Sequence, residues 1–572
     1  MDFKTFLEHF DTIAQAPNGI AKLRSLILDL AVRGKLVPQN PEDEPASVLL
    51  DKAQFLKEQS NNQKKKKKLT ISPDEILFDA PNGWVWIRLE EVVESMANGI
   101  YKPDSYYCDD GVACLRMYNI DQGKINFRNL KRMNLTNDEI QQYKLQSGDL
   151  LVNRVNSREL VGKAAVIPDI NEPLIFESKN IRVRLFESNY LPKYLCNLFQ
   201  TRLVRETFEG DAKQTTGQAS INQSQVSNIV IPLPPLAEQK RIVEKVDELM
   251  ALCDRLQDSQ ETRDQLRQKL RESAIASLMN AETDEELQKN WAIVHDNWHT
   301  LSQKPEDVND LRRSICQLAV RGKLSSQDST DQPSSKLLEE VRSKKELLIQ
   351  NKEIPKTKNI GLIEQSETIY KIPHNWSWAR LGEITKVIEY GTSEKASEVK
   401  NTVPMFRMNN IQNGRLIFDN LKYVSESIKD LPKLYLKDGD LLFNRTNSYE
   451  LVGKTGLFRG QDNQYTFASY LIRITLFKEF ISPEFVNLSM NSAYFRQTQI
   501  EPEIVQQCGQ ANFNGTKLQN TLIPLPPLAE QKRIVAKVDE MMQMCEQLEE
   551  SLRQSQQKVE ALVASAISHL TF

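Results

Sequence analysis

The stretch Ile231–Met250 reads IPLPPLAEQKRIVEKVDELM, and it returns at Ile523–Met542 as IPLPPLAEQKRIVAKVDEMM, with 18 of 20 residues identical. Other segments recur on both sides of it at offsets of 288 to 292 residues. These are LAVRGKL at 30–36 and 318–324, the pairs Trp84/Trp86 and Trp376/Trp378, and SGDLLVNRVNSRELVGK at 147–163 with DGDLLFNRTNSYELVGK at 438–454. The chain of 572 residues is therefore a tandem duplication whose repeat is half the protein.

Each copy of the opening stretch leads into a predicted long helix. The proline blocks, Pro232–Pro235 and Pro524–Pro527, are expected to end a strand and leave an extended entry to that helix. Apolar residues then recur at steps of 4 and 3, which predicts a coiled-coil seam. The seam positions are Ile242, Val246, Leu249, Cys253 and Leu256 in the first copy, and Ile534, Val538, Met541, Cys545, Leu548, Leu552, Val559, Leu562 and Ala566 in the second.

About 40 residues at 1.5 Å each give a rod roughly 60 Å long. The simplest packing sets the two helices against each other. Antiparallel pairing would put one globular domain at each end. Parallel pairing is also possible, but it would crowd both domains together.

The predicted fold class is α+β, with two domains of mixed α/β character separated by two long helices. Short β-branched runs broken by Gly, Asn, Asp and Pro fill the domains, and Ile181–Leu185 and Leu471–Phe477 have the pattern of matching strands. The expected limits are 1–80 for an N-terminal helical region and Lys-rich linker, 81–235 for the first domain, 236–372 for the central spacer helix and repeated helical region, 373–527 for the second domain and 528–572 for the C-terminal spacer helix.

The region before each domain is predicted to be helical. Residues 3–35 read as two short helices with a break at Pro17–Gly19, and the pair returns at 291–323. Gly34 and Gly322 fit helix C-caps. The run Lys64–Lys68 could neutralise phosphates and make binding depend on salt, but it has no second copy, so a solvated linker is favoured.

Composition excludes several classes of protein. The net charge of −3 gives no global basic field, so any nucleic acid must be bound by local patches. The seven cysteines are scattered without a CxxC pair and are expected to be reduced thiols. An acidic N-terminus and the lack of a long apolar run predict a soluble cytoplasmic protein with no membrane partner.

No catalytic or metal-binding set is predicted. Gly453–Thr455 resembles the end of a P-loop, but Ser448 stands where its first glycine belongs. His295 and His299 lack the HExxH arrangement. The only consecutive prolines lie in the two proline blocks, so the chain has no Asn-Pro-Pro-aromatic loop for a flipped adenine.

Polar residues placed alike in both copies are the candidates for DNA binding. Arg, Asn and Gln can form paired hydrogen bonds to base edges, while Lys and Ser suit phosphates. They are Arg116, Asn119, Arg154, Asn156, Ser157, Lys163, Gln218 and Asn222 in the first copy, and Arg407, Asn410, Arg445, Asn447, Ser448, Lys454, Gln510 and Asn514 in the second. Such residues can equally form turns and buried hydrogen bonds, and for the GDLL and Asn-Ser segments this structural interpretation is favoured.

Residues that differ between the copies are better candidates for reading sequence. Two domains that read different words must differ where they touch bases. Tyr118 against Asn409, and Arg158 against Tyr449, fall in this class, as do the stretches 101–114 and 392–404.

Two domains, each followed by PLPPLAEQKRIVxKVDE and a heptad helix, with GDLLxNR inside and LAVRGKL before, resemble the specificity subunit of a type I restriction–modification enzyme. The resemblance covers essentially the whole chain. It implies two target recognition domains, each reading one half of a split double-stranded DNA target, and an antiparallel helical spacer that fixes the gap between the halves.

The resemblance also implies partners that carry the chemistry. Two modification subunits would methylate adenine with S-adenosylmethionine, and restriction subunits would use ATP and Mg²⁺ to translocate and cleave DNA, so this chain would hold no cofactor. The helical segments 1–80 and 281–372 are longer than a minimal member needs and could dock the modification subunits. The alternatives are a stand-alone DNA-modifying enzyme, such as a nuclease or methyltransferase, and a structural coiled-coil scaffold.

Overall fold

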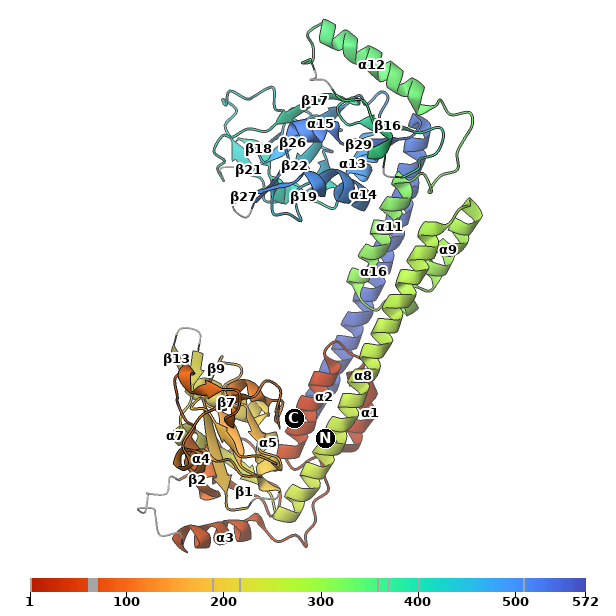
Figure 1. Cartoon of the computed structure of the whole chain (residues 1–572). Helices are drawn as coiled ribbons and strands as arrows, with labels where there is room; N and C mark the ends of the chain where they lie inside the picture. The colour runs from red at the N-terminus through yellow and green to blue at the C-terminus, as the bar shows by residue number, and fades with distance from the viewer. Residues whose placement is uncertain are drawn as a thin grey trace. The chain divides into compact units, whose positions relative to one another are not determined.

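The computed structural model of the chain describes residues 3–59, 70–187, 190–215, 218–356, 360–368, 370–398, 402–507 and 510–571. It consists of two compact units (Figure 1). Unit 1 comprises Met1–Arg263 with Gln556–Phe572, and unit 2 comprises Asp264–Ser555. The predicted run Lys64–Lys68 lies outside the described residues.

Unit 1 begins with helices and continues into a domain of short strands. Its elements are α1 Phe3–Ala14, α2 Gly19–Val32, α3 Ala46–Gln59, η1 Pro73–Glu75, β1 Val85–Arg88, η2 Leu89–Glu91, β2 Val93–Asn98, η3 Asp104–Tyr106, β3 Tyr107–Cys108, β4 Val112–Leu115, η4 Met117–Asn119, β5 Ile120–Asp121, β6 Lys124–Ile125, β7 Lys131–Met133, α4 Asn137–Tyr143, β8 Leu150–Asn153, β9 Val155–Asn156, β10 Ala164–Val166, β11 Leu174–Phe176, β12 Asn180–Leu185, α5 Leu191–Phe199, α6 Arg202–Asp211, β13 Lys213–Thr215, β14 Gln218–Ser220, α7 Gln223–Ser227, β15 Val230–Leu233 and the first part of α8 Leu236–Asn280.

Unit 2 follows a similar order. Its elements are the last part of α8, then α9 Asp284–Asp296, α10 Trp298–Leu301, η5 Pro305–Asp307, α11 Val308–Val320, α12 Ser334–Gln350, η6 Gln365–Glu367, β16 Ser377–Arg380, β17 Thr385–Tyr390, β18 Val403–Phe406, η7 Met408–Asn410, β19 Ile411–Gln412, β20 Arg415–Leu416, β21 Lys422–Val424, β22 Leu441–Asn444, β23 Thr446–Asn447, β24 Thr455–Leu457, β25 Thr466–Phe467, β26 Leu471–Leu476, α13 Pro483–Met490, α14 Ala493–Phe495, η8 Arg496–Ile500, η9 Glu501–Glu503, β27 Val505–Gln507, β28 Gln510–Asn512, α15 Gly515–Asn520, β29 Leu522–Leu525 and most of α16 Leu528–Thr571.

The two domains are built around equivalent strands. In unit 1 the order β10-β8-β12-β2 forms an antiparallel sheet, and β26 takes the place of β12 beside β22 and β17 in unit 2. Burial alternates along most of β12, as its sequence predicts, because one side of the strand faces the core. The paired strands expected at Ile181–Leu185 and Leu471–Phe477 are thereby confirmed.

A two-stranded sheet closes each domain and corrects one expectation. In unit 1, β1 pairs with β15, and Trp86 lies opposite Pro232. In unit 2, Trp378 lies opposite Pro524 in the same way. The strands end inside the proline blocks, at Leu233 and Leu525, but they continue through the first proline of each block, which was not expected. Among the described residues, β15 and β29 each have a single partner strand, and proline is tolerated where its missing N–H is not needed by a neighbour.

The long helices contribute to both units. In unit 1, the start of α8 shares a core with α2 and with Val559 and Val563 of α16. In unit 2, Leu278 near the end of α8 shares a core with α11 and with the first turns of α16. In each unit the beginning of one long helix therefore lies with the end of the other, which is antiparallel pairing. The structure adds a third helix to each pair (Figure 1).

The predicted seam holds over most of its length and shifts near the end of α16, and the side chain of its last predicted member, Ala566, lies outside the described residues. Ile242, Val246 and Cys253 are almost fully buried, as are their counterparts. Leu562, however, is 60% exposed, and Val563 is buried in its place. A straight helix has 3.6 residues per turn, so a strict 3.5-residue seam drifts around it, and one extra residue restores contact with the core.

The helical pair before each domain is confirmed in unit 1, where α1 and α2 flank the break at Pro17–Gly19. In unit 2 the equivalent region holds α9, α10 and α11. Gly34 and Gly322 have φ of 65° and 70°. Their N–H groups and those of the following lysines bond back to the last turn of the helix, which confirms the C-caps.

Candidate nucleic-acid interface

A short turn in unit 1 carries Tyr118. This turn, η4, is held by Asn119, whose side-chain oxygen accepts the backbone N–H of Arg116 at 2.9 Å. The Asn119 amide donates to the carbonyl of Asn126 at 2.8 Å. Asn119 is 5% exposed. Its hydrogen-bonding groups are used inside the domain, which favours the structural interpretation of this residue.

The turn η7 has the same construction in unit 2. The side-chain oxygen of Asn410 accepts the backbone N–H of Arg407 at 2.9 Å, and its amide donates to the carbonyl of Asp419 at 2.9 Å. Asn410 is 3% exposed. Two equal scaffolds therefore present the residue that precedes the buried asparagine.

That residue differs between the copies and faces solvent in both. Tyr118 is 65% exposed, and Asn409 is exposed at the equivalent position. The Arg116 guanidinium lies 5.4 Å from the centre of the Tyr118 ring, and its Nε lies 3.4 Å from the carboxylate of Glu177. The other Glu177 oxygen accepts the N–H of Met117 at 3.0 Å. Arg116 therefore supports Tyr118 from a fixed position.

The Asn-Ser segments hydrogen-bond within their own domains. The side-chain oxygen of Asn156 accepts the N–H of Ser157 at 2.9 Å, and its amide donates to Asn153 at 2.9 Å. In unit 2, the side-chain oxygen of Asn447 accepts the N–H of Ser448 at 2.8 Å. These contacts give the segments a local turn of the kind that Asn favours, in line with the structural interpretation.

Arg154 and Arg445 occupy equivalent half-buried positions. Arg154 donates to the carbonyl of Ser178 at 3.5 Å, and Arg445 donates to that of Ser469 at 3.2 Å. The Arg445 guanidinium also lies 5.0 Å from the ring centre of Tyr390. Nε of each arginine is buried and has no hydrogen-bond partner among the described residues. Both guanidinium groups thus retain a donor that the described part of their domain does not use.

A small sheet brings distant candidates together. In unit 1, Ala219 of β14 pairs with Asn156 of β9, so Gln218 lies next to the Asn-Ser segment. In unit 2, Ala511 of β28 pairs with Asn447 of β23, and Gln510 takes the matching place. Gln218 and Gln510 are exposed. Segments about 60 residues apart in sequence therefore share one edge of each domain.

Asn222 and Asn514 are exposed N-caps of short helices. The side-chain oxygen of Asn222 accepts the N–H of Gln225 at 3.0 Å, at the start of α7. The side-chain oxygen of Asn514 accepts the N–H of Lys517 at 2.8 Å, at the start of α15. Capping occupies the side-chain oxygen of each asparagine.

The remaining candidates differ in exposure. Arg158 is exposed, whereas Tyr449 is half-buried beneath Arg496, whose guanidinium lies 5.8 Å from the ring centre. Lys163 is half-buried, and burial lowers its pKa. Lys454 at the matching position is exposed. Arg158 and Lys454 are therefore free to approach a ligand, while Tyr449 is part of the packing.

Sequence reasoning missed Glu177, which anchors Arg116. The second copy has Ala468 at this position, so a search for shared polar residues passes over it. It also did not single out Tyr101 within the diverged stretch 101–114, although this side chain is 81% exposed. The sequence signal that could have revealed Glu177 is its replacement by alanine in the second copy, in the connection between β11 and β12, which is otherwise similar in both copies.

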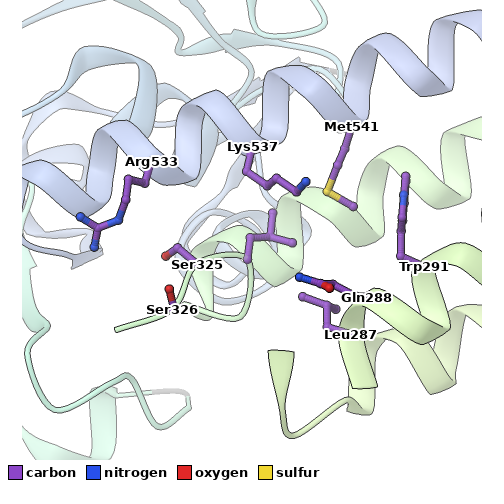
Figure 2. A pocket seen from close by; sticks show the side chains of 9 residues that line it. Leu287, Gln288, Trp291, Ser325, Ser326, Arg533, Lys537 and Met541 are labelled. Atoms are coloured by element: carbon purple, nitrogen blue, oxygen red, sulfur yellow. The ribbon is translucent and has the colours of Figure 1, made fainter. Parts of the chain in front are cut away.

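A cavity of about 330 Å³ lies elsewhere, among the helices of unit 2 (Figure 2). It is lined from α9, from the segment after α11 and from α16 by Leu287, Gln288, Trp291, Leu324, Ser325, Ser326, Arg533, Lys537 and Met541. None of the candidate DNA-binding residues lines it. Its walls combine apolar side chains with two basic groups.

Membrane-spanning helices and metal-binding clusters are both absent from the described residues. No helix in the described ranges is long and apolar enough to cross a membrane. Within the same ranges, no group of three or more His, Cys, Asp or Glu side chains is placed to hold a metal ion.

A family model described as "Type I restriction modification DNA specificity domain" matches residues 81–264 and 373–558, one match in each half. The chain belongs to this family. As a type I specificity chain with two recognition domains in tandem, it is the non-catalytic subunit that provides DNA target specificity.

Curated relatives match along nearly the whole chain. The type I restriction enzyme EcoAI specificity subunit of Escherichia coli is 29% identical over 584 residues, covering 96% of this chain and 94% of that protein. The EcoEI specificity subunit of Escherichia coli is 28% identical over 562 residues, covering 94% and 92%.

Two solved structures also align with this chain. An HsdS subunit from Thermoanaerobacter tengcongensis is 18% identical with a TM-score of 0.42, covering 86% of this chain and 98% of that one. A chain from a study of type I R-M complex assembly and conformational transition is 19% identical with a TM-score of 0.47, at the same coverage.

Proposed function

We propose that each recognition domain binds one half of a split double-stranded DNA target and that the two long helices set the gap between the halves. The observation that supports this most is the pair of equal turns, η4 and η7, which present Tyr118 in one domain and Asn409 in the other. Two domains that recognise different half-site sequences need different side chains at the DNA, and equal backbone turns can present them in the same position.

The partners follow from the same proposal. Two modification subunits would methylate adenines in the bound target with S-adenosylmethionine, and restriction subunits would use ATP and Mg²⁺ to translocate and cleave unmodified DNA. We assign the docking of the modification subunits to the helical regions 1–80 and 281–372. The complex would act in the cytoplasm, where its DNA lies.

The experiment is to co-express the chain with the modification subunit of the same restriction–modification system and to map methylated adenines across the host genome. The expected result is a single split motif with one fixed gap. Methylation without such a motif, or none with an active modification subunit present, would refute the proposal. Methyl transfer by the isolated chain would instead support a stand-alone enzyme.

A further inference from the structure

Each long helix begins at a buried carboxylate that receives hydrogen bonds from two other parts of the chain. Glu238, in the first turn of α8, is 1% exposed. The indole N–H of Trp84, at the start of the recognition domain, donates to one of its oxygens at 2.9 Å. The amide of Gln39, in the segment after α2, donates to the other at 2.5 Å.

Unit 2 repeats the arrangement around Glu530, which is also 1% exposed. Trp376 donates to one oxygen at 2.9 Å, and Gln327 donates to the other at 2.6 Å. Ser325 adds a third hydrogen bond at 3.0 Å. We call each of these sets, Gln39/Trp84/Glu238 and Gln327/Trp376/Glu530, a joint, because it connects the helical region, the recognition domain and the long helix.

A salt bridge ties the same segments again along the helix. Arg241 pairs with Asp43 at 2.5 Å in unit 1, and Arg533 pairs with Asp331 at 2.6 Å in unit 2. The two contacts are at equivalent places in both copies. Together with the joint they hold the segment after the helical pair against the first two turns of each long helix.

Stability alone does not explain a buried carboxylate at this position. Burial raises the pKa of both Glu238 and Glu530, which reflects the cost of placing a charge away from water. Apolar residues of similar size often stabilise a core as well or better. A buried network whose groups are all satisfied instead rigidifies one arrangement, and here it connects the domain that reads DNA to the helix that spaces the readers.

We propose that Glu238 and Glu530 are positioning residues that fix the angle of each recognition domain on its long helix, so that the complex accepts only one gap between half-sites. This inference rests on the proposed bipartite recognition. Neighbouring base pairs are about 3.4 Å apart. A domain that can tilt or slide by that distance can bind its half-site one base pair nearer to or farther from the other half-site.

The test is made in the complex with the modification subunits. Glu238→Met removes both acceptors and keeps the length of the side chain. Glu238→Gln keeps an oxygen that accepts the hydrogen bond from Trp84. Its new NH2 group can donate to the side-chain oxygen of Gln39 once the Gln39 amide has flipped. Glu244→Gln, at an exposed position on the same helix, is the matched control. Methylated adenines are mapped for each variant, and sites are sorted by word and by gap.

The expected result is that Glu238→Met leaves both words unchanged while the preference for the native gap over gaps one base pair longer or shorter falls roughly 10-fold or more, the factor set by one hydrogen bond to a charged group. Glu238→Gln and Glu244→Gln keep the narrow gap. An unchanged gap profile in Glu238→Met, or an altered word, overturns the proposal.

If Glu238→Met gives no methylation, Gln39→Ala decides, because Gln39 is exposed and contributes only one of the bonds. A broadened gap in that variant supports the joint, and the wild-type profile refutes it. Failure of the bipartite proposal itself is seen separately, since the wild-type complex would then show no split motif.

Discussion

Tyr118 is the residue at which the first domain is expected to read its word. It stands exposed on a turn that its own domain holds rigid, and Arg116 supports its ring. The second domain presents Asn409 from the same scaffold. The two domains therefore differ in the amino acid at this position and not in the shape of the turn, so this amino acid can determine a difference between the two half-site sequences.

Exchange of these two side chains tests that view. Tyr118→Asn should relax or change one position of the first half-site, with a loss of about 1–3 kcal/mol in discrimination there, and leave the second word intact. Methylation mapping gives both words at once. Phe127→Asn is the control, because Phe127 is 46% exposed and the second copy also has phenylalanine there, Phe418. If the first half-site sequence is unchanged in Tyr118→Asn, Tyr118 does not take part in base recognition.

Lys345 gives a residue-scale prediction on stability. Its ammonium group is buried in unit 2 and donates to the carbonyls of Gly382 and Thr385, and burial lowers its pKa to about 8. Between pH 8 and 10.5 the unfolded chain keeps a proton that the folded chain has lost, so stability due to this group rises with pH.

The free energy of unfolding should therefore rise with pH in the wild type relative to Lys345→Met, by up to about 3 kcal/mol over this window. Urea unfolding of the full chain at several pH values measures it. Lys344→Met, at the exposed neighbouring position, should follow the wild type. Parallel pH profiles for wild type and Lys345→Met would contradict the prediction.

At the scale of elements, the sequence predicted much and missed specific contacts. The helix C-caps follow from glycine and are found, and the seam follows from spacing and is found except near the end of α16, where Val563 replaces Leu562. Pro232 was expected to end a strand, but it lies inside β15, opposite Trp86 of β1. A missing N–H is harmful only where a neighbouring strand needs it as a hydrogen-bond donor. Such pairing is a property of the assembled sheet.

The candidate site shows the same division. The duplication located Asn119 and Asn156, but only the structure shows that they bond inside their own domains. Glu177 was missed, since the position is Ala468 in the second copy. A shared polar residue marks a requirement of the scaffold as readily as a ligand contact, and sequence alone cannot separate the two.

The long helices carry the prediction at this scale. Removal of one heptad from the middle of α8 and one from the middle of α16 keeps the period of the seam. It shortens each helix by about 10 Å, which corresponds to roughly three base pairs. The mapped motif should keep both words and have a shorter gap. Altered words at an unchanged gap would count against the helices as a spacer.

At the scale of the whole molecule, each domain is expected to act on one word alone. Exchange of residues 84–231 for the corresponding domain of another family member, with the tryptophan at position 84 kept, should replace the first half-site and preserve the second half-site and the gap. The two ends of the exchanged segment lie next to each other, because β1 pairs with β15. A change in both half-sites would refute the assignment of one domain to one word.

The packing of α16 into unit 1 has a consequence for how the protein is made. Val559 and Val563 belong to the core that also contains α2 and the start of α8. A ribosome therefore produces all of unit 2 before it supplies these side chains. Domains formed early in synthesis usually complete their folding early, whereas here unit 1 must wait, with part of its core open, for residues that are translated after all of unit 2.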